Sequence, residues 1–133
     1  MGANTVPRFI EQPQTWKTQV SVANANISGN TGTLATLLTG KVEHGSKVDY
    51  FWFQAQNATQ TNRLRLYLFT AGSTPHLLKE ISVSGSSASA VNKTMFSTSW
   101  TPAIPVVVPA GWTLQCSVHS ANVINIFGFG GDY

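Results

Sequence analysis

Aromatic and large aliphatic residues are concentrated in two segments, VDYFWFQ (residues 48–54) and RLRLYLFT (residues 63–70). A connection of small and polar residues separates them. In the second segment the leucines alternate with arginine, tyrosine and phenylalanine, so Leu64, Leu66 and Leu68 share one face of an extended strand. We expect this leucine face to lie in the core.

The first segment is apolar on both faces. Phe51 and Phe53 point one way and Tyr50 and Trp52 point the other, because successive side chains of a strand alternate. This pattern is typical of a central strand that is covered on both sides. The two segments are therefore expected to be the strands around which a β-sandwich is built.

Further extended segments follow one another at a spacing of roughly 8–12 residues, which is the spacing of an antiparallel sandwich or barrel. No stretch has a useful length of helical periodicity. We predict an all-β, antiparallel, jelly-roll-like sandwich. The additional strands are expected at residues 16–22, 33–39, 77–83, 93–100, 106–108, 112–118 and 123–129. The expected core includes Phe51, Leu64, Leu66, Leu68 and Leu114.

Length and composition agree with one globular domain. The chain has 133 residues, of which 42% are hydrophobic, enough for a core without disulfides. Charged residues make up 10%, against about 25% in an average protein. Such an uncharged surface is common in extracellular and viral β-proteins and suits protein–protein contacts. The net charge of +3 comes from scattered residues, so a nucleic-acid partner is not expected.

The N-terminal region is expected to form an extended arm at residues 1–15, followed by the sandwich domain at residues 16–133. Prolines interrupt regular pairing in the arm, yet its apolar residues need cover. The arm either packs back across the domain or docks on a neighbouring chain, and we expect the second. The predicted contacts are Val6, Pro7, Phe9 and Ile10.

The chain begins without the basic and apolar regions of a secretory signal, so we expect synthesis in a host cytoplasm. No apolar run approaches the roughly 20 residues that span a bilayer, so no membrane partner is expected. The single cysteine, Cys116, alternates with Leu114 and Val118, which predicts a buried hydrophobe rather than a nucleophile.

The residues that carry chemistry are few and scattered. Five carboxylates and three histidines occur without a motif spacing, and Glu43 and His44 lack a second pair of metal ligands. The glycines at 128, 130 and 131 precede no helix, so they predict a close backbone neighbour and not a phosphate site. We predict no enzyme activity, no catalytic residue, no cofactor and no metal.

The aromatic residues are the feature that could bind something. Tyr50, Trp52, Tyr67 and Phe69 could stack on sugar rings or form a subunit interface. We favour the interface, because the polar partners that sugar recognition needs are not clustered beside them in the sequence. We expect a homotrimer whose interface includes Trp52, Tyr67, Phe69 and Trp112.

The C-terminal part carries a resemblance to a known group of proteins. The segments VPAGWTL (residues 108–114) and VINIFGFGGDY (residues 123–133) resemble the end of small virion structural proteins of tailed bacteriophages. The resemblance implies a non-enzymatic β-sandwich of the particle, such as a capsid decoration (cement) protein or part of a head fibre or tail. Its partner would be the major capsid protein or another virion protein. The alternative is a carbohydrate-binding or receptor-binding module of a tail or fibre.

Overall fold

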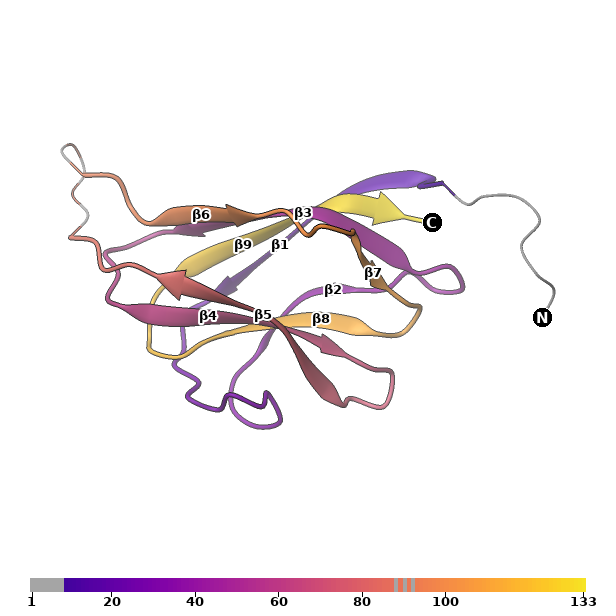
Figure 1. Cartoon of the computed structure of the whole chain (residues 1–133), viewed down its shortest axis with the longest axis horizontal. Helices are drawn as coiled ribbons and strands as arrows, with labels where there is room; N and C mark the ends of the chain where they lie inside the picture. Colours follow the sequence, from indigo (N-terminus) through magenta and orange to yellow (C-terminus); the bar gives the residue numbers. More distant parts are fainter. Residues whose placement is uncertain (1–8, 88, 90, 92) are drawn as a thin grey trace.

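The protein is a sandwich of two antiparallel sheets packed face to face (Figure 1). The computed structural model describes residues 9–87, 89, 91 and 93–133, and within them it has no helix. This confirms the predicted all-β sandwich. The strands are β1 (Gln12–Val20), β2 (Ala35–Thr39), β3 (Ser46–Ala55), β4 (Asn62–Phe69), β5 (Pro75–Val83), β6 (Ser97–Trp100), β7 (Val106–Val108), β8 (Thr113–Val118) and β9 (Ile124–Asp132).

The strands pair in nested order around the β4–β5 hairpin. β3 pairs with both β6 and β7, β2 with β8, and β1 with β9, all antiparallel. One sheet therefore has five strands, in the order β1-β9-β3-β6 with β7 also on β3, and the other has four, in the order β2-β8-β4-β5. This five-plus-four arrangement differs from an even split of eight strands, and the jelly-roll description stays a prediction.

The predicted leucine face lies in the core. Leu64, Leu66, Phe51 and Leu114 are completely buried, whereas Leu68 is half-buried at the margin of the core. Leu64 and Leu66 lie opposite Val118 and Cys116 of β8, so that small and large side chains alternate across the sheet. Period-two alternation therefore identified the inner face of β4 correctly.

The first strand begins earlier than expected. β1 starts at Gln12, so residues 12–15, which were assigned to the arm, belong to the sandwich. Pro13 is accommodated opposite Gly131 because β1 is an edge strand, where a missing N–H can face solvent. Ile10 lies against the backbone of Gly131, while Phe9 is exposed. Val6 and Pro7 lie outside the described residues, and their arm contacts stay a prediction.

The last strand is inserted between β1 and β3, and its glycines allow this close fit. A Cβ atom on Gly130 would overlap the carbonyl oxygen of Lys47, as the sequence predicted for the C-terminal glycines. At the end of β9 the Ser46 hydroxyl donates to Asp132 Oδ1 at 2.5 Å, and Gln14 Nε2 donates to Asp132 Oδ2 at 3.1 Å. One carboxylate thus ties β1, β3 and β9 together.

Leu66→Ala is expected to lower the free energy of unfolding by about 2–5 kcal/mol, because it leaves a cavity between the sheets. The matched control is Leu77→Ala on β5, where 43% of the side chain is exposed and the cost should stay within about 0.5 kcal/mol. Urea denaturation measures both. Equal costs for the two variants would contradict the position of the core.

Candidate binding surfaces

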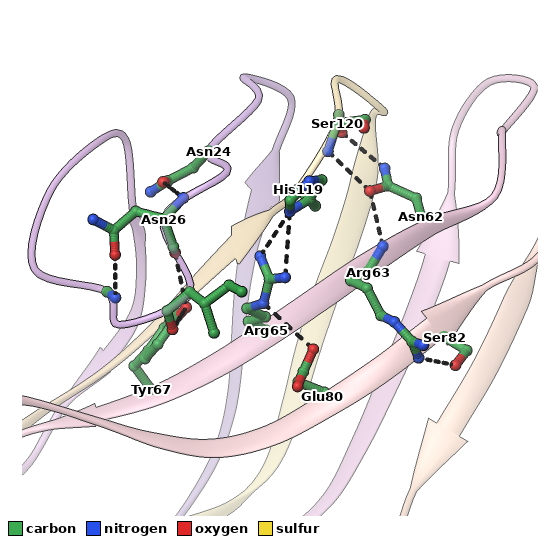
Figure 2. Close-up of polar contacts among 12 residues, drawn as sticks. Asn24, Asn26, Asn62, Arg63, Arg65, Tyr67, Glu80, Ser82, His119 and Ser120 are labelled. Carbon is green, nitrogen blue, oxygen red and sulfur yellow. Dashed lines mark hydrogen bonds and ion pairs between the residues drawn. The ribbon is translucent and has the colours of Figure 1, made fainter.

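The outer face of the four-stranded sheet is covered by the chain itself around Tyr67. The loop of residues 21–34, between β1 and β2, folds over Tyr67 of β4 (Figure 2). The Tyr67 hydroxyl donates to the carbonyl of Ile27 at 2.8 Å. Gly29 lies directly on the ring: a Cβ atom there would come within 2.7 Å of it, and its φ of +78° also favours glycine.

Asparagine side chains hold this loop in shape. Asn24, which is buried, donates to the carbonyls of Thr31 and Thr33 at 3.1 and 2.9 Å and accepts from the backbone N–H of Asn26 at 3.0 Å. Asn26 in turn accepts from the N–H of Gly29 at 2.9 Å. The loop therefore satisfies polar groups through its own side chains, and it meets the sheet at the bridge between Ala23 and Val118, where the Asn24 N–H donates to the Val118 carbonyl at 2.8 Å.

The burial of Tyr67 and Phe69 contradicts part of the predicted oligomer interface. Tyr67 is 0% exposed and Phe69 is 7% exposed within a single chain, so neither is available for contact with another copy. Their assignment to the interface is wrong because both side chains are already buried within one chain, Tyr67 beneath the loop and Phe69 beside the Tyr67 ring. Trp52 and Trp112 are half-buried and keep accessible surface, so their part of the interface stays a prediction.

A buried charge lies beside Tyr67 on the same face. The Arg65 guanidinium is 3.2 and 3.3 Å from His119 Nδ1 through its two terminal nitrogens, and its Nε is 3.4 Å from Glu80 Oε2 (Figure 2). Because arginine only donates, His119 Nδ1 acts as an acceptor here. A buried guanidinium requires such partners, so Glu80 and His119 are explained by a structural role.

Asn62 fixes the neighbouring loop between β8 and β9. Its amide donates to the carbonyl of Ser120 and to Asn122 Oδ1, both at 2.8 Å. Its oxygen accepts from the N–H groups of Arg63 and Ser120 at 2.8 and 2.9 Å (Figure 2). The side chain therefore uses its full hydrogen-bonding capacity to position the chain that enters β9.

The outer face of the five-stranded sheet is different, because among the described strands none lies over it in Figure 1. The register places Trp52 opposite Phe127 and Tyr50 opposite Phe129. The rings of Tyr50 and Phe129 have centroids 5.9 Å apart, and those of Phe127 and Phe129 are 6.5 Å apart. We call these four residues the aromatic face. β3 is thus covered on one side only, contrary to the expectation from its sequence.

Polar side chains gather beside Phe127 at one end of the aromatic face. Gln19 Nε2 donates to Asn125 Oδ1 at 2.8 Å and to Gln56 Oε1 at 3.1 Å, and Asn125 Nδ2 donates to the same Gln56 oxygen at 3.1 Å. We call these three residues the amide cluster. A groove of about 260 Å³ adjoins it. The groove is lined by Lys17, Thr18, Gln19, Asn125 and Phe127.

The amide cluster was missed by the sequence reasoning. Its three members are far apart in the chain. Gln19 lies opposite Asn125 because β1 pairs with β9. Gln56 follows closely after Gln54 of β3, which lies opposite Asn125 on the other side of β9. Long-range register of this kind has no local sequence signal. The structure thus places polar partners beside the aromatic residues, where the sequence showed none.

Exposed apolar side chains gather at the other end of the sandwich, where β1 begins and β9 ends. Phe9, Val42 and Val107 are 78%, 75% and 50% exposed, and Trp112 is half-buried nearby. We call these four residues the apolar end. It contains the predicted interface residue Trp112 and the predicted arm residue Phe9.

Backbone hydrogen bonds join the segments of the apolar end. Glu11 N–H donates to the Asp132 carbonyl at 2.9 Å, and Tyr133 N–H donates to Gly45, in the loop that carries Val42, at 3.1 Å. Gly40 N–H donates to the carbonyl of Trp112 at 2.9 Å. Val107 lies opposite Lys47, next to these segments. The segments that carry these four residues therefore lie at one end of the molecule, where Trp112 packs against the core and the other three side chains are exposed.

The remaining residues that could bind a metal or act as a nucleophile are few among the described residues. In the part of the chain that the structure describes, no three His, Cys, Asp or Glu residues are grouped so as to hold a metal ion. A helix long and apolar enough to cross a membrane is likewise not found among these residues. Cys116 is fully buried, as predicted. The predicted lack of enzyme activity and of cofactors stays a prediction.

These observations define the class of the protein as a two-sheet antiparallel β-sandwich with two exposed candidate contact surfaces, the aromatic face with its amide cluster and the apolar end. Comparison with protein-family models, with curated proteins and with solved structures finds no match. The resemblance to bacteriophage virion proteins therefore stays a prediction.

Tyr67→Phe is expected to destabilise the fold by about 0.5–1.5 kcal/mol, because it removes the hydrogen bond to the Ile27 carbonyl. Tyr50→Phe on the uncovered sheet is the matched control and should change stability by less than about 0.5 kcal/mol. Chemical denaturation compares the two. A larger loss at Tyr50 would contradict the assignment of covered and uncovered faces.

The thiol of Cys116 is expected to be unreactive in the native state. Burial raises the pKa of this thiol, because the thiolate is not solvated between the sheets. Ellman's reagent at mildly alkaline pH should therefore detect no thiol until guanidinium chloride unfolds the chain, and then it should detect one. Rapid labelling of the folded protein would contradict the position of β8 in the core.

Proposed function

We propose that the protein is a non-enzymatic structural protein of a larger assembly and that it docks on another protein chain through the apolar end. The observation that carries this proposal is that the segments of Phe9, Val42, Val107 and Trp112 meet at one end of the sandwich, where the first three side chains are at least half exposed. Single exposed apolar residues are ordinary, whereas a gathered group that includes aromatics is typical of interface cores.

The backbone at the apolar end is held in place by contacts between its strands. The Asp132 carboxylate holds β1 and β3 through Gln14 and Ser46, and Ile10 packs on Gly131 just before the strand begins. The segment that carries Phe9 therefore leaves from a fixed point. A preorganised contact surface loses little conformational entropy on binding.

For the setting of this contact we propose the virion, as the C-terminal resemblance implies. The protein would be a capsid decoration (cement) protein whose partner is the major capsid protein or another virion protein. A homotrimer is the proposed oligomer, because a closed ring lets every copy bury the same patch. The low charge content of the chain supports a wide, uncharged contact.

The proposal predicts that charge at the apolar end prevents assembly. Val42→Asp combined with Val107→Asp should reduce a trimer of the 14.3 kDa chain to a monomer, because a buried unpaired carboxylate is costly at an interface. Light scattering at micromolar concentration measures the mass. Both valines are exposed in the single chain, so the melting temperature of the domain should change little.

Val22→Asp is the matched control, since this valine is 55% exposed in the loop after β1, away from the apolar end. It should leave the trimer intact. A monomer mass for the unchanged protein would contradict the homotrimer. A trimer that survives both aspartates would place its contact elsewhere, with Trp52 as the next residue to test.

A second candidate function is a carbohydrate-binding or receptor-binding module. The observation that favours it is the amide cluster beside Phe127, which supplies the polar partners that sugar recognition needs.

A further inference from the structure

We infer that the groove beside the amide cluster binds a terminal ring of a neutral glycan through two neighbouring hydroxyl groups, with Phe127 stacked on the apolar face of the ring. The inference deepens the second candidate function and does not depend on docking through the apolar end. It follows from the hydrogen-bonding capacity, the charge, the size and the apolar wall of the groove.

The amide cluster has capacity left for a ligand. Gln19 uses both hydrogens of its Nε2 within the cluster, and the oxygens of Asn125 and Gln56 accept from it. Among the described contacts, three groups of the cluster are not used by these hydrogen bonds. The Gln19 oxygen can still accept a hydrogen bond, and both hydrogens of Gln56 Nε2 and one hydrogen of Asn125 Nδ2 can still be donated. The exposed cluster therefore keeps both donors and an acceptor for a ligand, with Gln19 and Asn125 lining the groove and Gln56 beside it.

Such an arrangement matches adjacent hydroxyl groups. Each hydroxyl donates one hydrogen bond and accepts others, so a pair of them on one ring is best bound by an acceptor next to a donor. A carboxylate or phosphate only accepts in its charged form, and the Gln19 oxygen would face it without a partner. The amide cluster thus favours a neutral polyol over an anion.

The charges and the apolar wall agree with this ligand. Lys17 is the single charged residue that lines the groove, and the other lining groups are hydroxyl, amide and aromatic. Phe127 offers a flat apolar surface beside the amides, which suits the C–H face of a pyranose. Trp52, opposite Phe127 in the register, extends this surface toward β3.

The size of the groove fits one ring. Its volume of about 260 Å³ is slightly below the roughly 300–1,000 Å³ of pockets that enclose a drug-sized ligand. The site is therefore expected to hold a single sugar unit, with further units running along the aromatic face. A site of this kind binds weakly as a single copy and gains strength when several copies act together.

Main-chain hydrogen bonds hold the backbone of all three residues of the amide cluster. Gln19 and Asn125 are opposed in the β1–β9 ladder, and Gln56 is placed by its backbone N–H, which donates to the Val123 carbonyl at 2.9 Å. The backbone of these three residues therefore needs little rearrangement on binding, which lowers the entropic cost of recognition.

The test is a titration of the full chain with maltohexaose, cellohexaose, chitotetraose, β1,4-galactotriose and a sialylated trisaccharide, after a screen on a glycan array. Side-chain amide signals of Gln19, Gln56 and Asn125 in ¹H–¹⁵N spectra report the site. We expect at least one neutral glycan to shift these signals. Asn125→Ala and Phe127→Ala should each weaken its binding by about 2- to 12-fold.

Gln12→Ala is the matched control, an exposed glutamine near the opposite end of β1, and it should bind as the unchanged protein does. Gln56→Ala, on the loop after β3, gives a second cluster variant that leaves the paired strands intact. Melting curves establish that each variant is folded.

Four results would overturn the inference. The first is no binding of any neutral glycan at millimolar concentration, and the second is binding that the cluster variants leave unchanged. The third is a preference for the sialylated trisaccharide, which would replace the neutral ligand by an acidic one held by Lys17. The fourth is self-association that Phe127→Arg abolishes, which would make the aromatic face a protein interface and would exclude a glycan site there. The first three results do not bear on docking through the apolar end, whereas the fourth would move the trimer contact away from it.

Discussion

The insertion of β9 between β1 and β3 is the constraint on which the other features of this molecule depend. It requires a glycine where the β9 backbone meets the Lys47 carbonyl. The same pairing sends Ile124 and Ile126 into the core and aligns Phe127 and Phe129 with the aromatic residues of β3. It also carries a carboxylate to the hydroxyl of Ser46 at the strand's end. Core, aromatic face and apolar end are thus set by one strand.

The apolar residues on the outer faces of the two sheets have different surroundings. On the four-stranded sheet, the asparagine-rich loop of residues 21–34 covers Tyr67 and satisfies its hydroxyl. On the five-stranded sheet, Trp52 and Phe127 stay half-buried and Phe129 stays 37% exposed, beside neutral amides rather than beneath a loop. The difference concentrates the available aromatic surface on one side of the molecule, which is why we place ligand binding there.

The two proposed contacts lie at opposite ends of β9. Asn125 near its start belongs to the amide cluster, and Asp132 at its end anchors the apolar end. The seven residue steps from Asn125 to Asp132 span about 23 Å at roughly 3.3 Å per residue. A copy docked through the apolar end would therefore hold its groove on the order of 20 Å away from the contact. Repeated copies on one particle would then present many weak sites together, an arrangement that raises avidity without a new contact.

The all-β class of fold, the inner leucine face of β4 and the burial of Cys116 could be predicted from the sequence, because alternation along a strand follows from local backbone geometry. It did not reveal that Pro13 lies within a strand, since that depends on β1 being an edge. It also misplaced Tyr67 and Phe69, because alternation divides a strand into two faces but does not show which outer face a distant loop covers. The amide cluster was decided by tertiary structure alone: Gln19, Gln56 and Asn125 meet only through strand register, which is a property of paired strands and not of any one segment.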